Sequence, residues 1–169
     1  KASIIICTRN RAESLRATLA AIGQVDVPAG LSTEIVVVDN GSIDNTYEAA
    51  ATANIPRMQV RYVREERRGL SNARNRGLGE SSSDLVLFTD DDVRPTAGWI
   101  GGMCEPLIRG IADAVTGGIV IPPHLQRSWL KDFLAVWLAA TPDLEEGPTT
   151  RLVGANMAFH RRVLASVHG

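Results

Sequence analysis

Residues Leu85–Pro95 read LVLFTDDDVRP. It begins with a continuous apolar run, Leu85–Phe88, and continues into three consecutive aspartates, Asp90, Asp91 and Asp92. An apolar run without alternating polar positions is typical of a strand buried on both faces, as in a parallel sheet covered by helices on both sides. The stretch therefore predicts a central strand with three carboxylates at its carboxyl end.

Strand-like and helix-like segments alternate over the rest of the chain. We expect further strands at Ala2–Cys7, Glu34–Val38, Met58–Val63, Ala114–Ile121 and Met157–Phe159. We expect helices at Ala12–Ile22, Asn45–Ala53 (with Asp44 as its N-cap), Leu70–Leu78, Thr96–Ile108, 127–140 and Arg161–Val167. This alternation predicts an α/β fold with a mostly parallel central sheet and helices on both faces, formed as a single domain over residues 1–169.

The composition excludes several classes of protein. The 169 residues are 44% hydrophobic and 22% charged, which is ordinary for a globular domain. The 18 basic and 19 acidic side chains give a net charge of −1, so there is no electrostatic basis for a nucleic-acid partner. Cys7 and Cys104 lie far apart in the sequence and are expected to be reduced thiols in a cytoplasmic protein.

No signal peptide and no apolar stretch as long as a membrane span is found in the sequence. The most apolar long piece is 129–140, which contains Lys131 and Asp132. We interpret it as a core helix, with a helix lying on a membrane surface as the alternative. The expected location is the cytoplasm or the cytoplasmic face of a membrane, with membrane proximity arising from parts outside this chain.

Polar clusters follow three of the expected strands directly. They are Thr8-Arg9-Asn10, Asp39-Asn40-Gly41-Ser42 and Thr89-Asp90-Asp91-Asp92. In an open parallel sheet, ligands bind outside the carboxyl ends of the strands. We therefore expect the three clusters to lie along one edge and to form a binding site.

The three aspartates favour a metal site. Adjacent ionised carboxylates raise one another's pKa unless a cation compensates, and Mg²⁺ and Mn²⁺ accept carboxylate ligands together with waters and substrate phosphates. In an extended segment, Asp90 and Asp92 point to one side and Asp91 to the other. We assign Asp92 as the metal ligand, with Asp90 beside it and free to bind a ribose hydroxyl. The alternative is a solvated acidic turn that caps the following helix.

An arginine in the third expected helix is placed on a face that should be buried. On a helix, Leu70, Arg74 and Leu78 share one face, and we expect the two leucines to face the core. An unpaired buried guanidinium is costly, so Arg74 needs an anion. The candidates are a ligand diphosphate and a structural ion pair with Asp39 or Asp90.

Asp39 and three glycines give weaker signals. The Asp39 carboxylate can accept a hydrogen bond from a nucleobase N–H, or the residue can cap or turn the chain. Gly41, Gly117 and Gly118 have permissive backbones that would let a ligand come close. Motifs of other folds are missing, since there is no G-x-G-x-x-G after the first strand, no G-x-x-x-x-G-K-[ST] and no G-x-S-x-G.

Five segments resemble, in order, the successive motifs of family 2 glycosyltransferases. They are SIIICTRNR (Ser3–Arg11), EIVVVDNGSIDNT (Glu34–Thr46), GLSNARNRGL (Gly69–Leu78), LVLFTDDDVRP (Leu85–Pro95) and GANMAFHRRVL (Gly154–Leu164). The resemblance runs along nearly the whole chain. It implies the GT-A fold, a Rossmann-like α/β sandwich, with a nucleotide-diphosphate sugar donor, a divalent cation (Mn²⁺ or Mg²⁺) and inversion at the anomeric carbon.

The resemblance also implies roles for single residues. The residues that it places at the nucleotide are Thr8, Arg9, Asn10, Asp39, Arg74, Asp90 and Asp91. The expected base of this nucleotide is uracil. The resemblance makes Asp92 the ligand of the metal, with Asp90 beside it, as in the family's D-x-D signature. The residues that it places near the donor sugar and the acceptor are Gly118, Gly154, Ala155 and Asn156. The resemblance does not identify the acceptor, which in this family is a saccharide, a lipid, a protein or a small molecule.

Two departures from the family pattern bear on catalysis. After Phe159 the chain has His160 before two arginines, and we interpret this histidine as a surface or core substitution and not as a base. Family members usually continue to an acidic segment that supplies the catalytic base, so we expect the base beyond Gly169 and the domain to be incomplete at its C-terminus. Two alternatives stay open: a sugar nucleotidyltransferase, and a nucleotide-binding module without catalysis.

Overall fold

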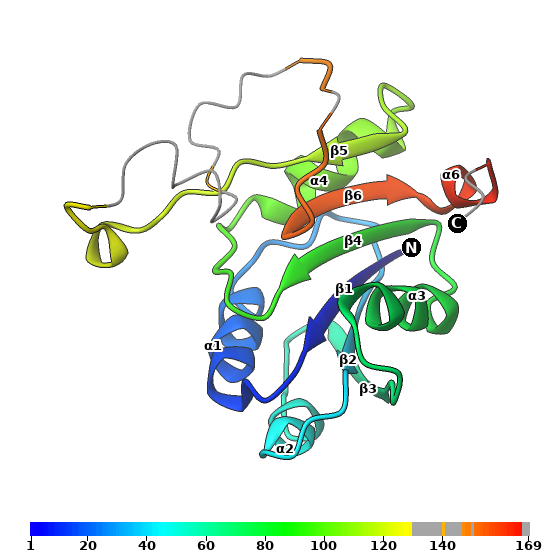
Figure 1. The fold of residues 1–169 in the computed structure, drawn as a ribbon. Helices are drawn as coiled ribbons and strands as arrows, with labels where there is room; N and C mark the ends of the chain where they lie inside the picture. Colours follow the sequence, from blue (N-terminus) through cyan, green and yellow to red (C-terminus); the bar gives the residue numbers. More distant parts are fainter. Residues whose placement is uncertain (130–139, 141–146, 150, 167–169) are drawn as a thin grey trace.

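The computed structural model describes residues 1–129, 140, 147–149 and 151–166, with side chains described as far as residue 164. Within these residues it contains a six-stranded sheet with helices on both sides (Figure 1). The strands are β1 (Ala2–Thr8), β2 (Thr33–Asp39), β3 (Met58–Arg64), β4 (Leu85–Asp90), β5 (Ala114–Thr116) and β6 (Asn156–His160). The helices are α1 (Ala12–Ile22), α2 (Thr46–Ala51), α3 (Leu70–Glu80), α4 (Trp99–Ile108), the 3₁₀ helix η1 (Pro123–Leu125) and α6 (Arg161–Ser166).

The strand order is β3-β2-β1-β4-β6-β5. The first four strands are parallel, and β6 runs antiparallel to both β4 and β5. The predicted mostly parallel sheet is therefore confirmed. The chain builds outward from β1 through β2 to β3 and then returns to place β4 on the other side of β1. This reversal creates a topological switch point between β1 and β4, where sheets of this kind bind ligands.

Successive strand residues pack into two separate apolar cores, one on each face of the sheet. On β1, Ile4 and Ile6 pack with the face covered by α1, α2 and α4, whereas Ile5 packs on the opposite face with α3. Leu164 of α6 is partly buried in this second core. Since both faces of the central strands are covered, most positions of β1, β2 and β4 need an apolar side chain. That requirement explains the continuous apolar runs in the sequence.

The strand predicted at Ala114–Ile121 is shorter than expected. It ends at Thr116, after which the Gly117 N–H bonds to the Asn156 carbonyl and the chain leaves the sheet. Two glycines follow the strand, and glycine is depleted in strands. Two prolines come shortly afterwards and have no N–H to donate to a ladder.

Asp44 does not act as a simple N-cap of the second helix. Its Oδ2 atom accepts a hydrogen bond from the N–H of Ala12, the first residue of α1, at 3.0 Å. Its Oδ1 atom accepts hydrogen bonds from both the N–H and the hydroxyl of Thr46, where α2 begins. One carboxylate thus joins the beginnings of two helices, and these hydrogen bonds lower its pKa.

The helix predicted at 127–140 lies mostly outside the described residues. Its first residues, 127–129, are not helical, and η1 precedes them. The apolar piece at 129–140 falls almost entirely on residues that are not described. Among the described helices, none has the length and apolar character that crossing a membrane requires.

Gly77 sets how closely α3 packs on the sheet. A Cβ at Gly77 would lie 2.5 Å from Ile5 Cγ2 and 3.1 Å from Val38 Cγ2. We therefore expect Gly77→Ala to lower the free energy of unfolding by about 1–3 kcal/mol through overpacking, as measured by urea denaturation. Gly79→Ala, in the same helix with open space around the new Cβ, is the matched control and should be neutral or stabilise by up to about 1 kcal/mol. Equal effects of the two changes would contradict the close packing.

Candidate functional site

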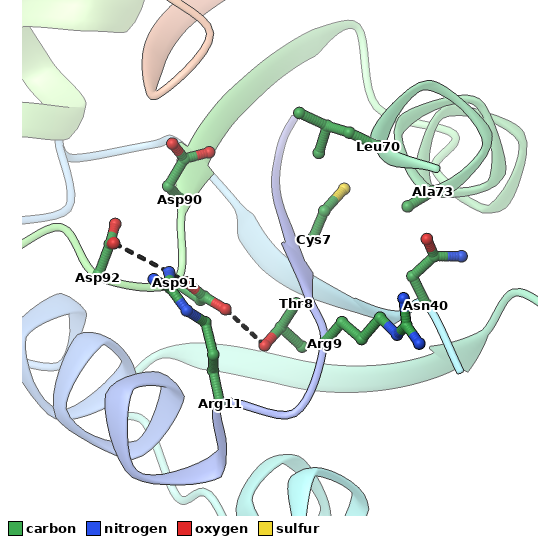
Figure 2. A pocket seen from close by; sticks show the side chains of 10 residues that line it. All are labelled: Cys7, Thr8, Arg9, Arg11, Asn40, Leu70, Ala73, Asp90, Asp91 and Asp92. Atoms are coloured by element: carbon green, nitrogen blue, oxygen red, sulfur yellow. Dashed lines mark hydrogen bonds and ion pairs between the residues drawn. The ribbon is translucent and has the colours of Figure 1, made fainter. Parts of the chain in front are cut away.

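The carboxyl ends of β1, β2 and β4 bring the three polar clusters together. The register places Thr8 beside Asp39, and Cys7 beside Asp90. The prediction that the clusters share one edge of the sheet is confirmed. A cavity of about 320 Å³, within the range of small-ligand sites, opens there. Its lining residues, drawn in Figure 2, are Cys7, Thr8, Arg9, Arg11, Asn40, Leu70, Ala73, Asp90, Asp91 and Asp92.

Asp91 points away from Asp90 and Asp92, as predicted, although Asp91 and Asp92 lie in the turn that follows β4 and not in an extended segment. Asp91 is buried, with 4% of its surface exposed. The side chains of Asp90 and Asp92 are 42% and 52% exposed. In Figure 2, Asp91 turns toward Thr8, whereas Asp90 and Asp92 do not. Two carboxylates of the run are therefore open to a ligand from the cavity.

Asp91 is held by donors from β1, from α1 and from Arg11 between them. Its carboxylate accepts hydrogen bonds from the Thr8 hydroxyl at 2.6 Å and from Arg11 Nη1 at 2.8 Å. Its backbone carbonyl accepts hydrogen bonds from the hydroxyls of Ser14 at 2.9 Å and Thr18 at 2.6 Å. The sequence placed Thr8 and Asp91 at the nucleotide. In the structure, their side chains bond to each other and anchor the acidic run.

Arg11 is a site residue that the sequence analysis missed. Its Nη1 atom lies 2.8 Å from Asp91 Oδ1 and 2.9 Å from Asp92 Oδ2. Hydrogen bonds to these carboxylates raise the pKa of the guanidinium, which is therefore fully charged. The residue follows Asn10, whose φ of 53° turns the chain between β1 and α1. Asparagine tolerates this left-handed conformation better than most residues, so the TRNR sequence itself was the available signal.

Asp90 and Asp92 suit a divalent cation. Asp92 uses Oδ2 for Arg11, and its Oδ1 atom accepts no hydrogen bond from the described part of the chain. Among the residues described, no three His, Cys, Asp or Glu side chains are arranged to enclose a metal ion. A cation here would take one or two carboxylates from the protein and complete its shell with water and phosphate oxygens. Mg²⁺ is usually bound in this way, and Mn²⁺ accepts the same ligands.

Arg74 lies beside the exposed carboxylate of Asp90. Its Nη2 atom is 3.9 Å from Asp90 Oδ1, and its guanidinium carbon is 5.6 Å from the centre of the Phe88 ring. Of the two ion pairs that the sequence left open, this is the one with Asp90. Burial raises the pKa of Asp90 above its usual value, Arg74 opposes that rise, and the charges of Asp92 and Asp91 add to it. An additional cation would therefore stabilise the ionised form.

The prediction that Leu70 faces the core is wrong. Leu70 is 52% exposed and lines the cavity, while Leu78 is partly buried against the core. The residues that α3 buries are Ala73 and Gly77, because small side chains let the helix approach the sheet closely. Arg74 is not among the residues that line the cavity, but it lies beside Asp90, which does, and 26% of its side chain is exposed.

Gly154 makes room for Arg74. A Cβ on Gly154 would lie 2.5 Å from Arg74 Nη2 and 3.0 Å from Nη1. The absence of a side chain at residue 154 leaves the space that the guanidinium occupies beside the segment that leads into β6. This contact joins two residues that the sequence assigned separately, one to the nucleotide and one to the sugar and acceptor.

Asn156 and its neighbours have their polar groups engaged within the protein. The buried Asn156 accepts a hydrogen bond from Trp99 Nε1 at 2.8 Å and donates one to the Gly118 carbonyl at 3.1 Å. A Cβ on Gly117 would overlap the Asn156 amide, so this glycine makes room for a side chain of the protein itself. Ala155 is buried. The predicted contacts of Gly118, Ala155 and Asn156 with sugar or acceptor thus remain predictions.

Asp39 and Asn40 organise the turn after β2. Asp39 is 1% exposed, and it accepts hydrogen bonds from the Ser42 N–H at 2.8 Å and from the Tyr62 hydroxyl at 2.6 Å. The turn role that the sequence left open is the one observed, and Asp39 is not among the residues that line the cavity. The amide of Asn40, which does line it, bonds to three backbone groups of the loop 65–69.

Arg9 and Asn10 differ in whether their polar groups have partners within the described part of the protein. Asn10 is fixed at both its backbone and its side chain, because its N–H donates to Ser42 Oγ at 2.9 Å and its Oδ1 atom accepts the Ile43 N–H at 2.8 Å. Arg9 is exposed, lines the cavity and makes no ion pair with the described residues. Of these two predicted nucleotide contacts, Arg9 is therefore the one whose charge is free for an anionic ligand.

The strand order, the switch point between β1 and β4 and the carboxylates at the end of β4 define a Rossmann-like α/β domain of the GT-A type. The model of glycosyl transferase family 2 matches residues 3–167, and the chain belongs to this family.

Solved structures share the fold over almost the whole chain. The mannosyltransferase PcManGT from Pyrobaculum calidifontis, in complex with GDP-Man and Mn²⁺, is 26% identical with a TM-score of 0.75, over 99% of this chain and 46% of that one. Glucosyl-3-phosphoglycerate synthase from Mycobacterium tuberculosis, solved with Mn²⁺, UDP and glucosyl-3-phosphoglycerate, is 22% identical with a TM-score of 0.69, over 99% of this chain and 59% of that one. At that identity, the second likeness shows the fold alone.

Curated relatives carry glycosyltransferase names. The dolichol-phosphate mannosyltransferase of Pyrococcus furiosus is 32% identical over 131 residues, which are 76% of this chain and 36% of the relative. The glucosyl-dolichyl phosphate glucuronosyltransferase of Haloferax volcanii is 26% identical over 179 residues, which are 100% of this chain and 55% of the relative. The chain thus spans about a third to about half of the length of these two relatives.

The two environments within the acidic run can be separated by matched substitutions. Asp91→Asn is expected to lower the free energy of unfolding by about 1–3 kcal/mol, because it removes the buried charge that pairs with Arg11 and an acceptor that Thr8 needs. Asp92 is exposed, so Asp92→Asn should change that free energy by no more than about 0.5 kcal/mol. Urea denaturation followed by circular dichroism measures both. A loss at Asp92→Asn as large as that at Asp91→Asn would mean that the two carboxylates do not differ in role.

Proposed function

We propose that this domain binds a nucleotide-diphosphate sugar together with Mn²⁺ or Mg²⁺ and transfers the sugar, with inversion, to an acceptor hydroxyl. The observation that carries the proposal is that two exposed carboxylates, Asp90 and Asp92, line the cavity at the switch point of a parallel sheet, and that Arg74 lies beside the first of them. Carboxylates attract a cation, and a cation with an arginine neutralises a diphosphate. Membership of glycosyl transferase family 2 and the GDP-Man and Mn²⁺ in PcManGT support this assignment.

In the proposed reaction, the acceptor oxygen bonds to the anomeric carbon from the face opposite the diphosphate. The bond from that carbon to the diphosphate oxygen breaks, and its electron pair leaves with the diphosphate, which inverts the configuration. The cation supplies positive charge to the departing diphosphate. Asp92 and Asp90 would hold the cation, and Arg74 beside Asp90 would add a second positive charge.

The acceptor proton needs a base. In the proposed mechanism, a carboxylate takes it as the oxygen attacks. We assign none of the described residues to this role. The half-buried His160 has its Nε2 atom 3.2 Å from the Leu107 carbonyl, which accords with a structural substitution.

The nucleobase has two candidates. The sequence resemblance favours uracil, whereas PcManGT, at 26% identity, was solved with GDP-Man. Both uracil and guanine present an N–H that a carboxylate or a carbonyl can accept. The proposed donor is therefore a UDP-sugar, with a GDP-sugar as the second candidate.

Calorimetric titration of UDP, GDP and dTDP, with Mn²⁺ and with chelator, tests the proposal. We expect one of these nucleotides to bind only when the metal is present, and Asp92→Asn to weaken that binding by about tenfold or more because a metal ligand is lost. Asp113→Asn is the matched control, since Asp113 is an exposed acid paired with Arg162 at 2.7 Å, and it should bind as the wild type does. If folded protein with Mn²⁺ binds none of the three, the proposed donor site is wrong.

The alternatives give different results in the same preparation. A sugar nucleotidyltransferase would release pyrophosphate from a sugar phosphate and a nucleoside triphosphate. A binding module without catalysis would bind the nucleotide and transfer no sugar to any acceptor.

Gly154→Ala tests whether Arg74 acts on the nucleotide. The new Cβ would displace the guanidinium, so we expect about tenfold weaker binding of the nucleoside diphosphate. The unfolding free energy should change little, because the group displaced is the end of a flexible side chain. Gly98→Ala, with nothing near its Cβ, is the control and should bind normally. Arg74→Ala should lose affinity, and adding Gly154→Ala to it should cost nothing further. Fully additive losses would contradict the coupling.

A further inference from the structure

Arg11 partly neutralises the carboxylate that we assign to the cation. Its Nη1 atom bridges Asp91 Oδ1 and Asp92 Oδ2 at 2.8 and 2.9 Å. The two ends of this bridge differ, since the Asp91 side chain is 5% exposed and that of Asp92 is 52% exposed. Buried charges need a partner, so Asp91 fixes the guanidinium in place. Asp92 therefore has a permanent positive charge on one of its two oxygens.

We propose that Arg11 is a positioning residue that serves as a built-in counter-ion of Asp92. It orients the carboxylate through Oδ2 and keeps the affinity of the donor-free site for a divalent cation low. The cation then binds tightly only in company with the diphosphate of the donor. This inference rests on the proposed function, because it concerns the same cation.

The charges of the site explain this preference. Three aspartates and three arginines, Arg9, Arg11 and Arg74, give the site no net charge. A divalent cation arriving alone would leave the site with an excess of positive charge. A cation that arrives with the two negative charges of a sugar-linked diphosphate leaves the site neutral. The site is therefore better matched to the neutral pair of ions than to the bare cation.

Removing the charge of Arg11 has two opposing effects on the cation. The first is the loss of an orienting hydrogen bond on Asp92, which is small because both partners are half exposed. The second is the loss of repulsion between a guanidinium and a divalent cation on one carboxylate. Even at the dielectric of water, this repulsion is equivalent to about a factor of ten in affinity at a separation of about 6 Å. The second effect should dominate.

The experiment measures Mn²⁺ binding to the whole chain without nucleotide, from the electron paramagnetic resonance signal of free Mn²⁺. Arg11→Gln keeps an N–H donor but removes the charge, and it should bind Mn²⁺ about tenfold more tightly than the wild type. Arg11→Lys keeps the charge and should bind like the wild type. Arg16→Gln is the matched control, because Arg16 pairs with Glu13 on the surface of α1, and it should bind unchanged.

An Arg11→Gln protein that binds Mn²⁺ equally or more weakly overturns the inference, because a purely structural role predicts that result. Tighter binding that persists after Asp92→Asn is added also overturns it, since the cation would then lie elsewhere. Thermal unfolding checks that Arg11→Gln is folded, which we expect because Asp91 keeps its hydrogen bond from Thr8. The nucleotide titration of the wild type is independent. If it succeeds while Arg11→Gln shows no gain, the role of Arg11 is wrong and the proposed function stands.

Discussion

The buried carboxylate of Asp91 is the constraint on which the site depends. A charge in this position must be paired, and the pairing ties the end of β4 to Thr8 of β1 and to Arg11 before α1. Two hydroxyls of α1 bind the carbonyl of the same residue. With the middle residue fixed at both its side chain and its backbone, Asp90 and Asp92 on either side of it line the cavity and stay exposed.

Two glycines determine where the positively charged partner of these carboxylates lies. Gly77 lets α3 approach Ile5 and Val38, and that approach brings Arg74 to the edge of β4. Gly154 then leaves the volume that the guanidinium occupies. The distance of 3.9 Å between Arg74 and Asp90 is thus a result of backbone packing. A preorganised charge costs no reorganisation when a diphosphate develops charge beside it.

The sequence predicted the features that depend on local pattern. Continuous apolar runs indicated a parallel sheet covered on both faces, and polar residues directly after the strands indicated the edge at which they meet. Features that depend on partners far away in the sequence were not predicted. Helical periodicity placed Leu70 in the core because it registers hydrophobicity and not size, whereas the close approach of α3 to the sheet requires alanine and glycine. The side chain of Asn156 is engaged by Trp99, a residue far away in the sequence. From its sequence position, Arg11 would be interpreted as a surface charge. In the structure, the turn at Asn10 places it next to the aspartates.

Exposure separates residues that one motif places side by side. Asp39 and Asp91 are almost completely buried, and each already accepts hydrogen bonds from at least two donors. Asp90, Asp92 and Arg74 keep between 26% and 52% of their side chains accessible. A buried polar group cannot exchange its partners without a large desolvation cost, whereas a half-exposed group exchanges water for a ligand at little cost. The buried members therefore act as supports, and the exposed ones are free to bind. Arg11 lies between these two classes, with one hydrogen bond to each, so its charge acts on the ligand while its position is set by the support.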